Sequence, residues 1–276
     1  MFELSGKVVV VTGGGSGIGR ALAIKAASRG ASVAIADIDL ARAQSLADEI
    51  GERARAFHVD VTQESSFEAL AGAILSAFGE VHVVFNNAGV YAWGPLEKTR
   101  MREVDWLIAV NIRGTINGSL AFLPLLRERA AAGELAHIVN IGSEHAVSLP
   151  TNGEHTAYTA TKHAVLGLTD GLRRDLEGSG IGVSLICPGV VRTNLWNSRR
   201  VRPDQFGGAR EAPPELAQSL DIGRSAEDTV ETAFEGLDAG EFLIITDNRI
   251  RGFTEPRLHM LAEALDACDR RLPPVE

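Results

Sequence analysis

The sequence has few cysteines, few aromatic residues, no excess of positive charge and no long apolar run. Its two cysteines, Cys187 and Cys268, form no CxxC pair, which excludes a disulfide framework and a zinc ribbon. The net charge of −9 argues against nucleic acid and against an anionic membrane as partners. No apolar stretch approaches the ~20 residues that span a bilayer, and residues 1–6 lack the pattern of a secretory signal. These absences predict a soluble, cytoplasmic protein with one sizeable core.

Glycine is abundant instead, and its placement near the N-terminus predicts a nucleotide-binding turn. The β-branched run 7–11 is typical of a strand buried on both faces, and the pattern of residues 21–27 predicts a helix. Between them, Thr12–Gly19 reads Thr-Gly-x3-Gly-x-Gly. A Walker loop would need Lys and Ser/Thr after the last glycine, and GxGxxG would need a glycine at Ile18. We expect the glycine backbone and the helix N-terminus to bind a pyrophosphate.

A carboxylate ends the second expected strand, residues 32–36. Asp37 follows Gly19 by eighteen residues, where it could accept hydrogen bonds from an adenosine ribose and would repel a 2′-phosphate. No basic residue stands beside Asp37 or at positions 14–16. The sequence therefore favours NAD over NADP as the cofactor. A reductase that works on ketones with NADPH is the alternative.

Strands and helices alternate along the chain, which predicts a doubly wound parallel sheet because such units require right-handed crossovers. The further expected strands are 54–59, 81–85, 137–141, 181–186 and 241–246, and the further expected helices are 40–50, 65–78, 97–126 (one helix or a pair) and 225–237. Ligands of such sheets bind beyond the carboxyl ends of the strands. The polar residues at or just past strand ends are Thr12, Asp37, Asp60, Asn87 and Ser143.

A tyrosine and a lysine lie four residues apart on the helix that we expect from His155 onward. Because residues four apart share a helix face, Tyr158 and Lys162 point the same way. A nearby ammonium favours the phenolate, although such a pair alone is more often a solvated surface feature. Ser143 lies where it could share a substrate oxygen with Tyr158. Asn111 stands among apolar neighbours, where a polar side chain is costly unless it is bonded.

The second half of the chain also contains a long irregular segment, about 193–224, which we interpret as a substrate lid. Trp196 in this segment, with Tyr91 and Trp93 after the Asn87 turn, favours an apolar or aromatic substrate. Core or subunit contacts explain these aromatic residues nearly as well. His145 is expected to line the substrate pocket.

We expect a single nucleotide-binding domain over residues 1–252, lid included, and a helical tail over residues 253–276. In the tail, Leu258, Leu261 and Leu265 recur at helical spacing, so it should pack on the domain or on a neighbouring subunit. Two His-Glu pairs, at 144–145 and 154–155, make no HExxH motif, and we therefore predict no metal site.

Five motifs together resemble the short-chain dehydrogenase/reductase family over about residues 5–242. They are the TGxxxGxG loop at Thr12, the Asn87-Ala88-Gly89 turn, Ser143, Tyr158-x3-Lys162 and Pro188-Gly189 before Thr193. The resemblance implies a Rossmann-type α/β fold with a seven-stranded sheet and a catalytic set of Asn111, Ser143, Tyr158 and Lys162. The cofactor contacts that it implies are Gly13, Ser16, Gly17, Ile18, Gly19, Asp37, Asp60, Val61, Asn87, Ala88, Gly89, Tyr158, Lys162, Pro188, Gly189, Val191 and Thr193.

The resemblance also implies a reaction, hydride transfer between a secondary alcohol or ketone and NAD. Tyr158 would be the general base, with its pKa lowered by Lys162 and the nicotinamide. Ser143 would hold the substrate oxygen, and Asn111 a water that links Lys162 to solvent. The substrate contacts would be Ser143, His145, Tyr158, Trp93 and Trp196. A dinucleotide-binding regulator or scaffold without turnover is an alternative, against which the full catalytic set argues.

Two further features follow from the same resemblance. Ser143 and Tyr158 are fifteen residues apart, slightly more than is usual in the family, so the loop 147–154 should be lengthened. The segments 94–99 and 200–203, with the tail, are similar to a subgroup of bacterial enzymes that oxidise benzylic alcohols of aryl ethers. Family members are commonly homotetramers or dimers, so a homo-oligomer is expected.

Overall fold

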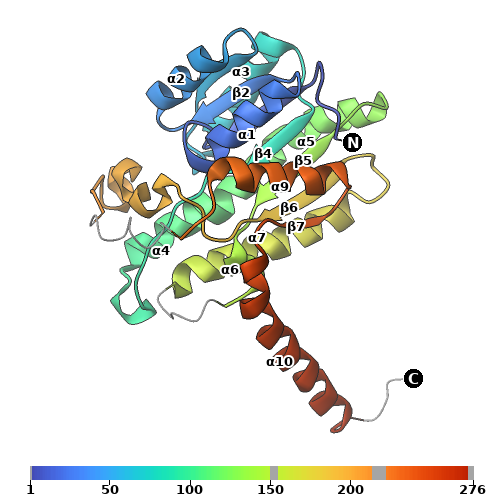
Figure 1. Ribbon diagram of the computed structural model, residues 1–276. Helices are drawn as coiled ribbons and strands as arrows, with labels where there is room; N and C mark the ends of the chain where they lie inside the picture. Colours follow the sequence, from blue (N-terminus) through green and yellow to red (C-terminus); the bar gives the residue numbers. More distant parts are fainter. Residues whose placement is uncertain (1, 150–154, 213–221, 273–276) are drawn as a thin grey trace.

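The computed structural model describes residues 2–149, 155–212 and 222–272, and its centre is a seven-stranded parallel sheet (Figure 1). The strand order is β3-β2-β1-β4-β5-β6-β7, and every pairing is parallel. The strands are β1 (Val8–Thr12), β2 (Ser32–Asp37), β3 (Ala54–His58), β4 (Val83–Asn86), β5 (His137–Ile141), β6 (Gly182–Cys187) and β7 (Leu243–Ile245). The predicted doubly wound sheet is confirmed, and the order reverses between β1 and β4, where such folds bind ligands.

Strand β1 shows why its sequence has no polar alternation. Val9 and Val11 pack into one apolar cluster, whereas Val8 and Val10 pack into a second cluster on the opposite face. Because successive side chains of a strand point to opposite faces, both sets must be apolar when helices cover both sides. All five residues of β1 are buried.

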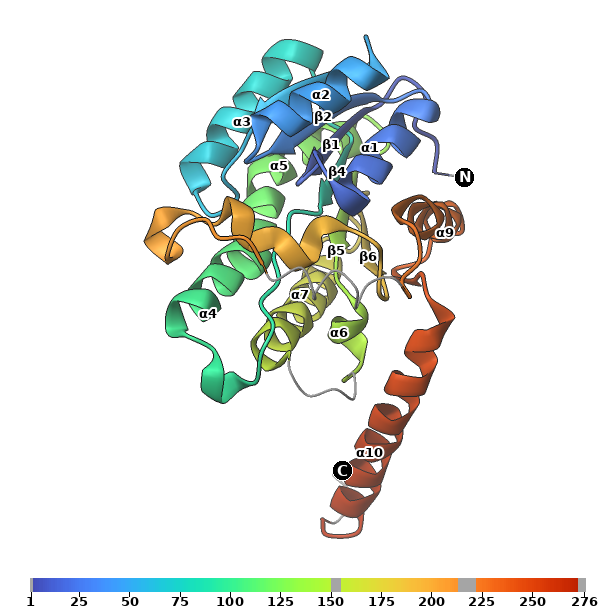
Figure 2. The ribbon, with the colours of Figure 1, turned by 60° about the vertical axis from the view of Figure 1, so that its left-hand side comes forward.

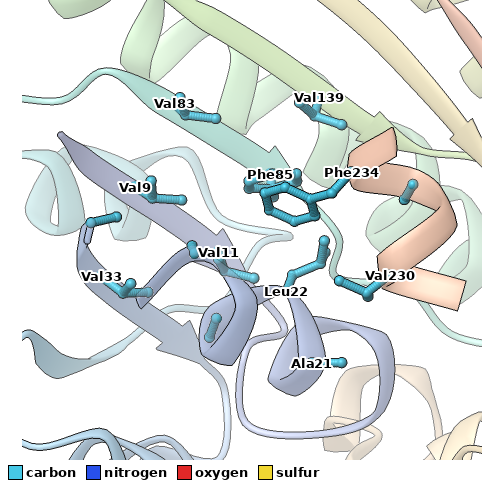
Figure 3. Packing of buried hydrophobic residues seen from close by; sticks show 14 of the residues in the cluster. Val9, Val11, Ala21, Leu22, Val33, Val83, Phe85, Val139, Val230 and Phe234 are labelled. Atoms are coloured by element: carbon cyan, nitrogen blue, oxygen red, sulfur yellow. The ribbon is translucent and has the colours of Figure 1, made fainter. Parts of the chain in front are cut away.

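Helices cover both faces of the sheet. The first cluster contains residues of α1 (Gly17–Ser28), α2 (Leu40–Ile50) and α9 (Ala226–Asp238), and Figure 3 shows Leu22 and Phe234 meeting Phe85 there. The second cluster contains residues of α3 (Glu64–Phe78), α4 (Met101–Leu107), α5 (Gly114–Ala131) and α7 (Thr156–Asp175). Full burial of a side chain such as Leu22 contributes roughly 1.5–3 kcal/mol, so these two layers fix the sheet on which the site is built.

The helical region predicted at 97–126 differs from its prediction at both ends. A 3-10 turn, η1 (Leu96–Lys98), comes first, α4 begins only at Met101, and α5 continues to Ala131. Between α4 and α5 lies a π-helical stretch, η2 (Ile108–Arg113), which joins them without a break. The sequence pattern could not show this, because a π segment leaves the helical periodicity nearly intact on either side.

The predicted lid is more regular than expected in the part that the structure describes. Two 3-10 segments, η3 (Asn194–Val201) and η4 (Asp204–Phe206), lie where we expected an irregular loop. Residues 213–221 of the lid and the loop residues 150–154 lie outside the described residues. A short helix, α6 (Glu144–Val147), follows β5 directly.

The described part of the C-terminal tail is helical, and it runs away from the rest of the chain in both Figure 1 and Figure 2. Helix α10 (Arg251–Asp269) follows a 3-10 turn, η5 (Asn248–Ile250), and has no buried residue. The side chains of its apolar stripe, Leu258, Leu261 and Leu265, are 58%, 48% and 68% exposed. Beyond its first turn the helix therefore does not pack on its own domain, and docking on a neighbouring subunit stays a prediction. Within the described ranges, no helix has the length and apolar character for crossing a bilayer.

Candidate active site

A cavity of about 1010 Å³ opens at the carboxyl ends of the strands. It extends from the glycine loop after β1, past the turn after β4, to the start of α7 and the lid segment η3. Of the residues that the sequence predicts for the site, Asn111 alone does not line it. Those that do are Gly13, Ser16, Gly17, Ile18, Gly19, Asp37, Asp60, Val61, Asn87, Ala88, Gly89, Trp93, Ser143, His145, Tyr158, Lys162, Pro188, Gly189, Val191, Thr193 and Trp196.

The glycine loop can only be built from glycine. Gly13 and Gly17 have φ of +63° and +54°, which L side chains rarely adopt. A Cβ on Gly13 would lie 2.9 Å from Cα of Ala88. A Cβ on Gly19 would lie 2.1 Å from the carbonyl oxygen of Gly13. The loop therefore exposes bare backbone beside the N-terminus of α1, a cradle that fits a pyrophosphate.

Hydrogen bonds tie the glycine loop to the turn after β4. Thr12 Oγ1 accepts hydrogen bonds from the backbone N–H groups of Asn87, at 3.0 Å, and Ala88, at 3.1 Å. In return, Asn87 Nδ2 donates to the carbonyl oxygens of Thr12, at 2.9 Å, and Gly13, at 3.2 Å. Two strand ends at the switch point are thus held as one unit, which keeps the floor of the cavity rigid.

Asp37 is fixed by backbone at the far end of the same cavity. Its Oδ2 accepts the N–H of Gly15 at 2.9 Å, and its Oδ1 accepts the N–H of Asp39 at 2.9 Å. The structure also brings two cations there that the sequence analysis missed, Arg42 and Arg200. Arg42 is five residues after Asp37, so the sequence could have placed it near this carboxylate. Arg200 comes from the lid, and no local pattern in the sequence places it there.

The catalytic candidates converge from two elements. Ser143 caps α6, where its Oγ accepts the N–H of His145 at 3.2 Å, and Tyr158 and Lys162 lie on one face of α7. Lys162 Nζ donates to the carbonyl oxygen of Ile141 at 3.0 Å and lies 5.8 Å from the centroid of the Tyr158 ring. Tyr158 and Lys162 are each only 5% exposed. The structure thus brings together the three side chains that the sequence selected.

Burial dominates the titration of this pair. It raises the pKa of Tyr158 well above its usual value, and a hydrogen bond from Ser143 acts in the opposite direction without offsetting it. Burial also lowers the pKa of Lys162 to about 8. The expected lowering of the tyrosine pKa by Lys162 is therefore not supplied by the chain's own residues. In this site the uncharged phenol is the favoured form.

Asn111 lies behind the cavity wall, in the π-helical stretch η2. Its Oδ1 accepts the N–H of Val90 at 2.8 Å, and its Nδ2 donates to Val90 O at 3.0 Å and to Thr161 Oγ1 at 3.1 Å. The side chain is 1% exposed. These contacts tie the loop after β4 to α7 at Thr161, the residue before Lys162.

Tyr158 belongs to a cluster of rings, of which the sequence pointed to Tyr91 and His145 but not to His155. The rings of Tyr91 and His145 meet that of Tyr158 edge-on at 5.0 and 5.2 Å, and Tyr91 Oη and His155 Nδ1 are 2.6 Å apart. Burial lowers the pKa of His145 to about 3, and the positive fields of His155, His163 and Lys162 add to the effect. His155 stands three residues before Tyr158, a helical spacing that could have indicated it.

Glu144 is a second cavity residue that the sequence analysis did not select for chemistry. Burial raises its pKa to about 7, the nearby Asp247 carboxylate raises it further, and Arg249 opposes both. Asp247 and Arg249, which also line the cavity, form an ion pair with each other at 2.5 Å. This acidic wall comes from segments about one hundred residues apart, which local sequence patterns cannot connect.

One group of possible metal ligands lies elsewhere, Glu80, His82 and Glu134. His82 Nδ1 accepts the N–H of Val8 at the start of β1, and its Nε2 lies 2.9 Å from Glu134. Lys7 pairs with Glu134 at 3.1 Å and Arg129 with Glu80 at 2.9 Å. Hydrogen bonds from His82 and Lys7 lower the pKa of Glu134. These ion pairs account for the group. Of the two His-Glu pairs weighed earlier, Glu154 lies outside the described residues.

Comparison with known proteins gives a consistent result. The family profile described as short chain dehydrogenase matches residues 7–204. The chain is 37% identical to a putative oxidoreductase SadH of Mycobacterium tuberculosis over 206 residues, which cover 73% of this chain and 72% of the relative. It is 29% identical to a C alpha-dehydrogenase of a Sphingobium species over 279 residues, covering 96% of this chain and 88% of that protein.

A solved structure shows the same likeness over the whole length. It is a short chain dehydrogenase/reductase from Burkholderia phymatum in complex with NAD, 33% identical to this chain. The two share a TM-score of 0.86, and the match covers 100% of each chain.

Proposed function

The chain belongs to the short-chain dehydrogenase family, and we propose that it transfers a hydride between a secondary alcohol, or the corresponding ketone, and NAD. The observation that carries the proposal is the convergence of Ser143, Tyr158 and Lys162 on the cavity that the glycine loop lines. A protein that only bound a dinucleotide would have no need to bury a tyrosine and a lysine beside a serine hydroxyl there.

Each part of the chain would hold one part of the cofactor. The loop Gly13–Gly19 offers backbone to the pyrophosphate, and Asp37 offers carboxylate oxygens to the adenosine ribose. Lys162 donates one N–H to Ile141 O, and its other N–H groups would donate to the ribose next to the nicotinamide. A bound nicotinamide would accept or supply the hydride, which no side chain can do.

The chain's own residues would transfer the proton. Tyr158 would exchange it with the substrate oxygen, and Ser143 would hold that oxygen by a hydrogen bond. Because burial favours the protonated phenol, Tyr158 is set to donate a proton to a ketone oxygen, and the reverse oxidation needs the phenolate. Asn111 supports both directions by fixing α7 against the loop after β4.

An uncharged aromatic or apolar substrate suits the wall around Tyr158. Tyr91 and Trp93 from the loop after β4 and Trp196 from η3 line the cavity, and Trp93 is 47% exposed. His145 is neutral at physiological pH because its pKa lies far below 7. The similarity to a protein named C alpha-dehydrogenase, over 96% of this chain, supports a dehydrogenase activity.

A second candidate, an NADPH-dependent ketone reductase, has one specific observation in its favour. Arg42 and Arg200 line the cavity beside Asp37, and guanidinium groups bind phosphate. Against it stands the Asp37 carboxylate, which would repel a 2′-phosphate. We therefore place NAD first.

The test uses the two tyrosines that the chain possesses, Tyr158 and Tyr91. Tyr158→Phe should lower turnover roughly 10³-fold or more by removing the acid–base group, with NADH binding nearly unchanged. Tyr91→Phe removes the neighbouring phenol hydroxyl and should lower turnover less than tenfold. The assay follows reduced nicotinamide absorbance over a panel of benzylic and alicyclic secondary alcohols. Wild-type turnover in Tyr158→Phe, or binding of NAD without turnover on any alcohol or ketone, would contradict the proposal.

A further inference from the structure

Arg200 belongs to the segment that the sequence predicts as a substrate lid, yet it lines the cavity at the opposite end. The segment η3 passes Trp196 on the substrate side and reaches the region of Asp37, Asp39 and Arg42 within a few residues. Burial is the main cause that lowers the pKa of Arg200. The charge of Arg42 lowers it further, and the charges of Asp37 and Asp39 raise it. The guanidinium therefore lies where the adenosine half of a dinucleotide would bind.

The side chain is held in place but not saturated. Its Nη1 donates to the carbonyl oxygens of Asn194, at 3.2 Å, and Asn197, at 3.0 Å, both in the same segment η3. Its Nε is buried and has no hydrogen-bond partner among the described residues. A buried donor left unpaired is unfavourable. The terminal Nη2 makes no hydrogen bond with the described residues and is not a buried atom, so it is the donor that a ligand in the cavity could reach.

The neighbouring cation does not share this property. Arg42 Nε pairs with Asp39 Oδ2 at 3.0 Å, one turn earlier in the chain. For Arg200, no carboxylate of the described residues lies within ion-pair distance, although three act on it from farther away. Of the two guanidinium groups at this end of the cavity, Arg200 is the one with a buried donor left unpaired and no carboxylate partner among the described residues.

We propose that Arg200 is a phosphate-binding residue of the lid, which donates hydrogen bonds to a phosphoryl oxygen in the adenosine half of the dinucleotide. The inference rests on the proposed function, because it presupposes a dinucleotide in this cavity. Arginine suits the task because its rigid fork matches phosphate oxygens and it stays charged. The segment η3 thereby touches cofactor through Arg200 and substrate through Trp196, so one segment links the two sites.

The phosphoryl oxygen has two sources, the pyrophosphate bridge that NADH and NADPH share and the 2′-phosphate that only NADPH carries. Calorimetric titration of the full chain with each dinucleotide distinguishes them. If Arg200→Gln weakens both affinities tenfold or more, Arg200 binds the bridge. If it weakens NADPH alone by that factor, it binds the 2′-phosphate. Either result supports the proposal, and Arg200→Lys should recover part of the affinity because it keeps the charge but loses the fork.

Arg199→Gln is the matched control. Arg199 belongs to the same segment but pairs with Glu103 at 3.1 Å and does not line the cavity, so its loss should leave both affinities within twofold. Thermal unfolding first checks that Arg200→Gln and Arg200→Lys are folded. If both folded variants bind NADH and NADPH within twofold of wild type, this inference is overturned and the proposed function stands. If the wild-type chain binds neither dinucleotide, both are overturned.

Discussion

The two ends of the cavity are constructed by different means. At the dinucleotide end, the backbone forms the site. The glycine loop is bare main chain, and two backbone N–H groups hold the carboxylate of Asp37. At the catalytic end, the working groups are side chains whose titration is displaced by burial, namely Tyr158 and Lys162. The geometry of the binding end therefore depends on the absence of side chains from the loop. The protonation states at the catalytic end depend on how far its side chains are buried from water.

The largest effect on dinucleotide binding should come from placing a side chain in the backbone-built end. In Gly19→Ala, the new Cβ would lie 2.1 Å from Gly13 O and 2.5 Å from Asn87 Nδ2, so the loop must move. We expect NADH affinity to fall by about two orders of magnitude or more, which corresponds to roughly 3 kcal/mol, together with a lower melting temperature. Calorimetric titration and thermal unfolding measure the two.

The matched control is Gly72→Ala on α3, where an added Cβ meets nothing within 4 Å. Because glycine is unfavourable by about 1 kcal/mol relative to alanine inside a helix, this variant should be slightly more stable and bind NADH as before. If Gly19→Ala behaves like Gly72→Ala, the close approach at the loop does not control binding.

A smaller effect is expected from Asp37, the side chain at the backbone-built end. Asp37→Ala removes the carboxylate that would bind a ribose diol and repel a 2′-phosphate. The ratio of NAD to NADP affinity should shift toward NADP by about 10- to 100-fold, or roughly 1.4–2.7 kcal/mol. Titration with both dinucleotides measures it. A wild-type preference for NADP would overturn the assignment of NAD.

The sequence was most informative where local pattern decides structure. Strand bounds came within about two residues, because β-branched runs between helices have few other solutions, and the glycine spacing at Thr12–Gly19 identified the loop. Long-range neighbours such as Arg200 beside Asp37 stayed hidden, since nothing local records them. The pKa of Tyr158 could not be foreseen either, because it follows from burial. The domain boundary, homo-oligomer and cytoplasmic location stay predictions.

An effect on stability rather than on binding tests the other end of the comparison, through Glu144. Its folded pKa, about 7, lies above the ordinary value of 4.5, so the folded state binds the proton more tightly. Stability from this group is therefore fully present below about pH 4.5 and lost as pH rises through 7. Glu144→Gln should be close to wild type in stability at pH 4.5 and exceed it by up to about 3 kcal/mol at pH 8.

Denaturant unfolding at both pH values measures this difference. The exposed carboxylate Glu128, on α5, provides the comparison, because Glu128→Gln should give no pH-dependent gain. A constant difference between Glu144→Gln and wild type across this pH range would show that the wall around Glu144 is wetter than its burial indicates.

The π-helical stretch η2 sets the phase of the long helix that contains it. An α-helix turns about 100° per residue, so one widened turn amounts to an inserted residue and rotates all that follows against all that precedes. Trp106, before the stretch, faces the cavity, and Ser119, after it, accepts a hydrogen bond from Asn86 Nδ2 at 3.2 Å. A chain shortened by one residue within 108–113 could keep one of these alignments but not both. The length of this stretch is thus as strict a requirement as any side chain in it.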